Sequence, residues 1–177
     1  MLDNKVLRNI YDFASVLVTA VLAVAVIFTF VFKISVVDGS SMNNTLFDGD
    51  KLILTARDWK VETGDIVVIS QPNIYEKVLI KRVIATQGQT ITVDASKGQV
   101  IVDGVVLDEP YIAAVTRVQG NMTYPITVPE GKVFVMGDNR NASTDSRDIF
   151  VGLIDTRYIV GEAVYRVGDT HLLQTAE

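Results

Sequence analysis

The chain has 177 residues, of which 49% are apolar, and it carries a formal net charge of −5. This length allows one domain with a sizeable core plus an appendage. The chain has no cysteine, which excludes disulfides, thiol catalysis and cysteine-ligated metals. Its single histidine, His171, lies in a polar tail, so a histidine triad or a multi-histidine zinc site is also excluded. Because the balance is acidic and there is no basic run, nucleic-acid binding is not expected.

An uncharged apolar segment lies near the start of the chain. Residues 13–32 contain no charged side chain. A helix of about 20 residues, rising about 1.5 Å per residue, spans about 30 Å, the thickness of a bilayer core. The alternatives are a cleaved signal peptide or a buried core helix, but the segment is longer than a typical signal-peptide core and has no amphipathic stripe. The sequence therefore predicts a membrane anchor at residues 13–33.

Basic residues flank this anchor unevenly. Lys5 and Arg8 precede it, and Lys33 follows it. Because positive charge is retained on the cytoplasmic side, the bias predicts that residues 1–12 are a short cytoplasmic N-terminus. Residues 34–177 would then form an extracytoplasmic domain, where disulfides are an option and not a requirement.

Short strands dominate the rest of the chain. Runs rich in Val, Ile and Leu, bounded by turn residues, predict strands at residues 34–37, 51–55, 66–69, 77–85, 90–93, 99–107, 132–136 and 161–167. The run at 99–107 is expected to be a hairpin with Asp103-Gly104 at its turn. Residues 108–125 are expected to form a loop, and residues 155–159 one helical turn. Many short strands at regular spacing are typical of an antiparallel barrel or coiled sandwich.

The first polar stretch after the anchor contains a candidate nucleophile. Ser40 and Ser41 follow Gly39, and a glycine allows a tight turn with an amide free to face a ligand. Gly-Ser-Ser is also ordinary turn composition, so a serine alone is weak evidence. Lys81, in a strand of apolar residues, is a candidate base, because an apolar setting lowers the pKa of a lysine. The alternative is a solvated lysine on an edge strand.

A long polar stretch follows the predicted strand at 132–136. Residues 137–147 read Gly-Asp-Asn-Arg-Asn-Ala-Ser-Thr-Asp-Ser-Arg. A solvated loop is one interpretation. The other is that ion pairs between its acids and arginines fix the loop, and that Ser143 supplies a hydroxyl that orients a neutral amine.

Three motifs that follow the anchor resemble those of bacterial type I signal peptidases, also called leader peptidases. They are Gly-x-Ser-Met at 39–42, Lys-Arg-Val-Ile at 81–84 and Gly-Asp-Asn-Arg-x-x-Ser-x-Asp-Ser-Arg at 137–147. The last motif is long and highly specific, and the resemblance covers nearly the whole chain. The single anchor and small size resemble the short forms typical of Gram-positive bacteria. The resemblance implies a Ser–Lys serine protease with a mainly β fold, an antiparallel coiled sheet or partly open barrel that rests on the membrane.

The resemblance also implies roles for individual residues. Ser41 matches the family's nucleophile, Lys81 its general base, and Ser143 the serine that hydrogen-bonds the lysine amine. The implied activity is removal of signal peptides from secretory preproteins after small residues, in an Ala-x-Ala-like pattern, with no cofactor, metal or nucleotide. The remaining matches are the bracing pair Asp145 and Arg147 and the structural flank Asp138 and Arg140.

Three places depart from the family's pattern. Asn44 stands where the family usually has proline, so a rigid φ is lost. Residues 85–89 replace the usual Gly-x-Pro-Gly-Asp, which predicts a looser turn after the lysine strand. Gly39 stands where some members have an oxyanion-binding serine. The oxyanion hole is therefore expected to use backbone amides, chiefly that of Ser41, with the Ser40 hydroxyl nearby.

The substrate is expected to bind as an extended strand against residues 34–40 and 77–81. Small pockets there would accept small side chains and exclude large ones by clashes. Two other classes stay open: a non-catalytic assembly factor on the same scaffold, for example in pilus biogenesis, and a membrane-anchored binding domain. A third alternative is a self-cleaving repressor-type Ser–Lys protease. Such a protein would have a DNA-binding domain and no anchor, and neither holds here. The side chains expected to wall the pockets are Val37, Met42, Leu46, Leu79 and Ile80.

Overall fold

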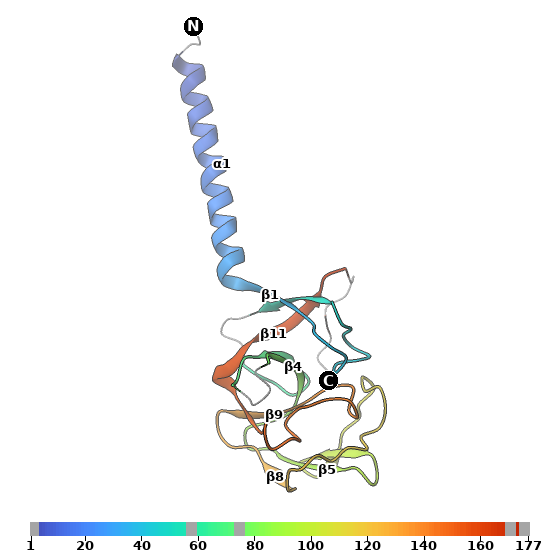
Figure 1. Cartoon of the computed structure of the whole chain (residues 1–177). Coiled ribbons are helices and arrows are strands. Elements are labelled where there is room, and N and C mark those ends of the chain that lie inside the picture. The colour runs from blue at the N-terminus through green and yellow to red at the C-terminus, as the bar shows by residue number, and fades with distance from the viewer. Residues whose placement is uncertain (1–3, 56–59, 73–76, 169–172, 174–177) are drawn as a thin grey trace.

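The computed structural model describes residues 4–55, 60–72, 77–168 and 173, with the backbone alone for residues 4 and 27–32. His171 lies outside the described residues. Figure 1 shows a long helix that projects from one end of a β domain. The domain contains a seven-stranded sheet, whose first strand continues from the helix, and a four-stranded sheet at the end remote from the helix.

Helix α1 (Asn4–Val31) contains most of the predicted anchor. Its stretch Lys5–Val26 is long and apolar enough to cross a membrane, and none of it is buried inside the protein. Tyr11 and Phe13, for example, are 71% and 72% exposed. A helix that is apolar on all sides and has no protein against it is stable in lipid and not in water. The helix therefore fits a single membrane span.

The larger sheet is antiparallel and curls into the predicted partly open barrel (Figure 1). Its strands are β1 (Phe32–Val36), β2 (Lys51–Thr55), β3 (Ile66–Ile69), β4 (Leu79–Thr86), β9 (Lys132–Met136), β10 (Ile154–Asp155) and β11 (Ile159–Arg166). Their order is β1-β2-β11-β3-β4-β9-β10. β1 is thus an edge strand, whereas β4 lies inside the sheet.

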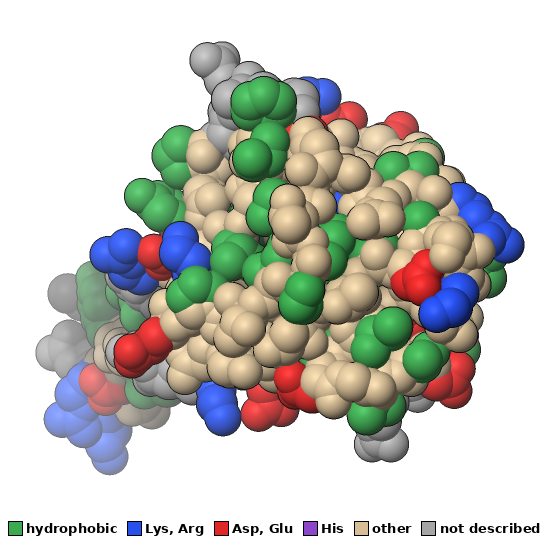
Figure 2. Space-filling view, turned by 90° about the horizontal axis from the view of Figure 1, so that it is seen from below, with side chains coloured by type: hydrophobic (Ala, Val, Ile, Leu, Met, Phe, Trp, Pro, Cys, Tyr) green, Lys and Arg blue, Asp and Glu red, His purple; other side chains and the backbone are tan. Residues whose placement is uncertain are grey.

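The smaller sheet contains β5 (Thr90–Asp94), β6 (Gln99–Val102), β7 (Val105–Val106) and β8 (Ile126–Thr127), in the order β7-β6-β5-β8. Asp103 and Gly104 have φ values of 51° and 82°, the left-handed pair that a two-residue hairpin turn requires, so the predicted hairpin is confirmed. Figure 2 shows the domain face remote from α1, where apolar side chains alternate with polar groups and charged side chains lie mostly near the rim.

Every predicted strand region contains a strand, and the predicted helical turn is present as η1 (Thr156–Tyr158). The sequence analysis missed β8 and β10, because two residues are too few to show a periodic pattern. Residues 108–125, expected to be a loop, contain no strand or helix. The predicted mainly β fold is therefore confirmed.

Strand β4 positions the most important predicted side chain. Lys81 pairs with Val67 of β3, and Arg82 pairs with Met136 of β9. All residues of β4 except its last, Thr86, are buried. Charged side chains on such a strand must find partners inside the protein. The edge-strand alternative for Lys81 is therefore wrong.

Candidate active site

Ser41 lies in the turn of residues 38–46, which leads from β1 toward β2 and is called the nucleophile turn here after its candidate nucleophile. Gly39 has a φ of 91°, a left-handed conformation that other residues rarely adopt, and its N–H donates to the Asp48 carboxylate at 2.8 Å. Met42 and Leu46 are buried in the core, and the Leu46 N–H donates to the Met42 carbonyl. The Gly39 turn, its bond to Asp48, and the buried side chains of Met42 and Leu46 therefore hold Ser41 in place.

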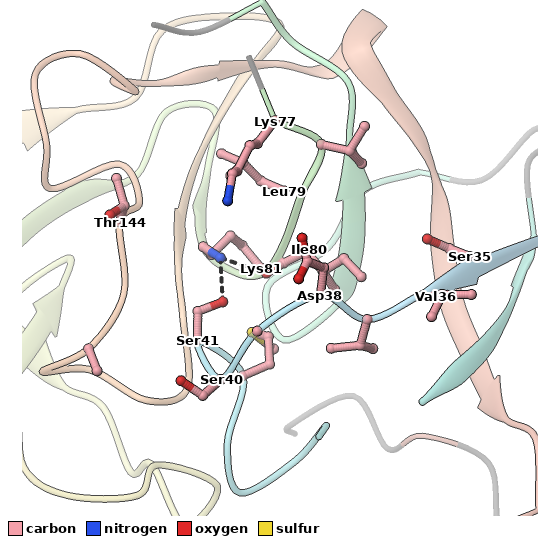
Figure 3. A pocket seen from close by; sticks show the side chains of 15 residues that line it. Ser35, Val36, Asp38, Ser40, Ser41, Lys77, Leu79, Ile80, Lys81 and Thr144 are labelled. Carbon is pink, nitrogen blue, oxygen red and sulfur yellow. Dashed lines mark hydrogen bonds between the residues drawn. The ribbon is translucent and has the colours of Figure 1, made fainter. Parts of the chain in front are cut away.

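The side chains of Lys81 and Ser41 point toward each other (Figure 3). Lys81 Nζ donates to Ser41 Oγ at 2.7 Å and to the Ile80 carbonyl at 2.9 Å. The whole residue is only 3% exposed. Two side chains 40 positions apart in sequence thus lie within hydrogen-bond distance. This is the geometry that a base needs to take a proton from a hydroxyl.

Burial lowers the pKa of Lys81 to about 8 from its ordinary value of 10.5. The carboxylates of Asp145 and then Asp138 oppose this shift, since negative charge favours the ammonium form, whereas Arg147 adds to it. With this pKa, roughly one Lys81 in ten is neutral at pH 7. A substrate that covers the amine would exclude more water and lower the pKa further.

Asp138 connects its own loop to the lysine strand and to the nucleophile turn. Its carboxylate accepts from Arg82 Nε at 2.9 Å, from Arg82 Nη2 at 2.7 Å and from the Thr45 hydroxyl. Arg82 also donates to the Gly64 carbonyl at 2.8 Å, and its guanidinium lies 4.0 Å from the centre of the Tyr111 ring. Both charged side chains are almost completely buried. Arg82 follows Lys81 directly, so the Arg82–Asp138 pair ties the lysine strand to the 137–147 loop, and Thr45 ties that loop to the nucleophile turn.

Ion pairs fix the third-motif loop, residues 137–147, as predicted. Asp145 pairs with Arg147 at 2.8 Å and accepts the N–H of Gly137 at 3.0 Å. Arg140 does not pair with an acid of this loop. It pairs instead with Glu109 at 2.6 Å, from the 108–125 segment.

Ser143 and the Ser41 carbonyl both lie against Gly137. Ser143 Oγ is buried and makes no hydrogen bond with any residue that the structure describes, so the predicted bond to the Lys81 amine is not made here. A Cβ on Gly137 would collide with both Ser143 Oγ and the Ser41 carbonyl. The glycine is therefore required for this close approach of loop and turn. Ser40, the other predicted support, is exposed beside the groove.

A groove of about 470 Å³ runs over the Ser41–Lys81 pair. Its walls are residues 35–42 and 77–81, which include most of the 34–40 segment and all of the 77–81 segment predicted to hold the substrate, with Thr144 on the opposite side (Figure 3). One predicted wall residue needs correction: Leu46 does not line the groove, because it is fully buried in the core. The other four predicted wall residues, Val37, Met42, Leu79 and Ile80, do line it.

Side-chain hydrogen bonds hold the turn after β4. The side-chain oxygen of Gln89 accepts the Thr86 N–H at 2.8 Å and also lies within hydrogen-bond distance of the Thr86 and Thr63 hydroxyls. Gly88, with a φ of 84°, supplies the left-handed position. The departure from the family's pattern at residues 85–89 therefore leaves a hydrogen-bonded turn.

The sequence analysis missed Asn139, Glu109 and Tyr111. Asn139 bonds the nucleophile turn: its N–H donates to the Ser41 carbonyl at 3.0 Å and its side-chain Nδ2 to the Ser40 carbonyl at 3.1 Å. Its place in the third motif was a usable signal, because asparagine after a strand often bonds backbone groups. Glu109 and Tyr111 lie in the 108–125 segment, which has no motif and no periodic pattern, so nothing in the sequence signalled their contacts.

Comparisons with known proteins agree on one family. The family model described as "Signal peptidase, peptidase S26" matches residues 10–167. Signal peptidase I of Bacillus licheniformis is 32% identical over 171 residues, covering 89% of this chain and 88% of that protein. Probable signal peptidase I-1 of Synechocystis sp. is 37% identical over 160 residues, covering 85% of this chain and 78% of that protein.

A crystal structure of a signal peptidase I from Enterococcus faecalis is 30% identical, covers 59% of this chain and 97% of its own, and superposes with a TM-score of 0.46. The family assignment needs only the family match and the curated relatives, which span most of the chain. The N-terminal apolar helix agrees with a single-pass membrane protein. The chain therefore belongs to the signal peptidase family, peptidase S26, and is a signal peptidase that acts on secretory preproteins at the membrane.

Proposed function

We propose that Ser41 is the nucleophile and Lys81 the general base of signal-peptide cleavage. The observation that carries the proposal is the 2.7 Å hydrogen bond between Lys81 Nζ and Ser41 Oγ, made by a lysine that is 3% exposed. Burial lowers the pKa of Lys81 to about 8, which makes the neutral, proton-accepting form available near neutral pH.

The reaction would proceed through an acyl-enzyme. Neutral Lys81 takes the proton of the Ser41 hydroxyl, and Ser41 Oγ attacks the scissile carbonyl. Lys81 then protonates the leaving amine, and in the second half it activates a water that releases the acyl group. These steps use side chains, backbone and water, so the mechanism needs no metal, nucleotide or other cofactor.

Backbone amides would stabilise the oxyanion that forms during attack. The Ser41 N–H donates to no acceptor among the residues that the structure describes, so it is available to a substrate. Ser40 is exposed next to it, and its hydroxyl is a candidate second donor. A preorganised donor at this position is typically worth about a hundredfold or more in rate.

The groove suits an extended peptide with small side chains. Residues 35–40 belong to or follow the edge strand β1, and residues 77–81 face them across the groove. A peptide between the two segments could add backbone hydrogen bonds to both. Val37, Leu79 and Ile80 narrow the groove with apolar side chains. These features support cleavage after small residues, in an Ala-x-Ala-like pattern.

The groove lies close to the anchor. β1 continues directly from α1, and Ser35 already lines the groove. Ile34 and Val36, on the same strand, are apolar and exposed, which suits a position at the lipid surface. We infer that residues 1–12 are cytoplasmic, that 13–33 span the membrane and that 34–177 face the outside. The signal peptide, held in the same bilayer, would then reach the groove from the membrane side.

A cleavage assay on a secretory preprotein in detergent tests the catalytic pair. Ser41→Ala and Lys81→Ala should each abolish cleavage while the protein stays folded by circular dichroism. The exposed pair Ser96 and Lys97, which both bond Asp94 on the smaller sheet, provides matched controls, and their alanine variants should cleave normally. Normal cleavage by Ser41→Ala or Lys81→Ala would refute the role given to that residue. If cells that carry Ser41→Ala keep the wild-type phenotype, the assembly-factor alternative would be favoured.

A further inference from the structure

Asn139 bonds the backbone on both sides of the nucleophile. Its N–H donates to the Ser41 carbonyl at 3.0 Å, and its side-chain Nδ2 donates to the Ser40 carbonyl at 3.1 Å. The Ser40 carbonyl also accepts the Asn43 N–H at 3.1 Å. This one carbonyl therefore receives two donors, one from its own turn and one from the third-motif loop.

The Ser40 carbonyl and the Ser41 N–H are two ends of one planar peptide group. A contact that fixes the carbonyl therefore also fixes the direction of the N–H. Donors at the carbonyl polarise the peptide as well, which strengthens its N–H as a donor. The Ser41 N–H has no acceptor among the described residues, and Ser41 lines the groove, so this polarised N–H is available to a substrate.

We propose that Asn139 is a positioning residue for the oxyanion hole, because its side-chain amide orients the Ser40–Ser41 peptide so that the Ser41 N–H meets the oxyanion. The inference rests on the proposed role of Ser41 as nucleophile. Residue 39 is glycine and has no side chain that could donate to the oxyanion. Stabilisation of the oxyanion therefore depends more strongly on the Ser41 N–H. Only the transition state and the tetrahedral intermediate carry the oxyanion, so Asn139 acts on kcat and not on KM.

The test compares Asn139→Ala with Asn141→Ala, both as full chains in detergent. Asn141 lies on the same loop, and its side chain accepts the Arg117 N–H at 2.8 Å and donates to the Val115 carbonyl at 3.1 Å. Each substitution removes an amide that bonds backbone, but only Asn139 bonds the nucleophile turn. The measurements are kcat and KM on a preprotein-derived peptide, inhibition by a peptide aldehyde, and the pH dependence of kcat/KM. The aldehyde is informative because its adduct with a serine carries an oxyanion.

For Asn139→Ala we expect kcat to fall about tenfold to a hundredfold, somewhat less than for removal of a whole oxyanion donor. KM should stay within about twofold, and aldehyde affinity should fall by about the same factor as kcat. The acidic limb of the pH profile should not move, because Lys81 keeps its contacts, whereas a general loosening of the site would admit water and shift it. Asn141→Ala should keep kcat within about threefold of the wild type.

Equal losses of kcat in the two variants would overturn the inference. So would an Asn139→Ala enzyme whose kcat stays within about threefold of the wild type, or one whose loss is confined to KM. If Asn139→Ala does not fold, Asn139→Asp replaces it, since the carboxylate has the same shape but cannot donate to the Ser40 carbonyl. Full activity of Asn139→Asp would then overturn the inference. Failure of the proposed function itself is separate, because it appears as activity in Ser41→Ala.

Discussion

Replacing Lys81 by methionine should stabilise the folded protein while it abolishes cleavage. Lys81 is 3% exposed, and burial lowers its pKa from 10.5 to about 8. The folded state therefore holds the charged amine less favourably than the unfolded chain does. At about 1.36 kcal/mol for each pKa unit, the shift lowers stability by about 3 kcal/mol at pH 7. Methionine fills a similar volume without a charge and adapts readily to a core.

The pH dependence follows from the direction of the pKa shift. Below a pH of about 8 the amine is protonated in both states, and the full penalty applies. As the pH rises from about 8 to 10.5, the folded state loses its proton first, so the unfolded state binds more protons and stability increases. Above 10.5 the amine is neutral in both states. The advantage of Lys81→Met should therefore shrink through this window and disappear above it.

Thermal unfolding of the full chain in detergent, followed by circular dichroism, measures this advantage. For a domain of this size, about 3 kcal/mol corresponds to about 10 °C in the unfolding midpoint. Ser41→Ala is the matched control, because it removes activity and the hydrogen bond but keeps the buried amine, so its stability should still rise with pH. A midpoint for Lys81→Met that does not exceed the wild-type value at pH 7, or a difference that does not change with pH, would refute the reasoning.

Two further substitutions separate catalysis from stability. Gly137→Ala should abolish cleavage, because its Cβ would collide with the Ser41 carbonyl, whereas Gly161→Ala, whose Cβ would collide with backbone of β2, should lower the unfolding midpoint but not the kcat of the folded enzyme. Loss of kcat in both variants would contradict this. Asp138→Ala should cost about 3–5 kcal/mol in the free energy of unfolding, since it leaves Arg82 charged, buried and without its carboxylate. A cost below about 1 kcal/mol in denaturant unfolding would show that other groups satisfy Arg82.

Local chemistry was readable from the sequence. A charge-free run at residues 13–32 predicts the anchor, because bilayer thickness alone sets its length and polarity. Periodic apolar runs and turn residues predict the strand regions and the hairpin at Asp103-Gly104, since both depend on neighbouring residues. The order and spacing of three motifs suggest Ser41 and Lys81 as a pair, although only through resemblance to a family.

The tertiary structure decided which side chains come into contact and which are shielded from water. Leu46 belongs to the core and not to the groove, and Arg140 pairs with Glu109 and not with its own loop. Asn139 meets the nucleophile turn across 99 positions of sequence. No local pattern encodes such contacts, because they depend on the order of strands in the sheet. The pKa of Lys81 has the same origin: it is set by burial of the side chain in the folded protein, and by the charges of Asp145, Asp138 and Arg147, which lie far from Lys81 in the sequence.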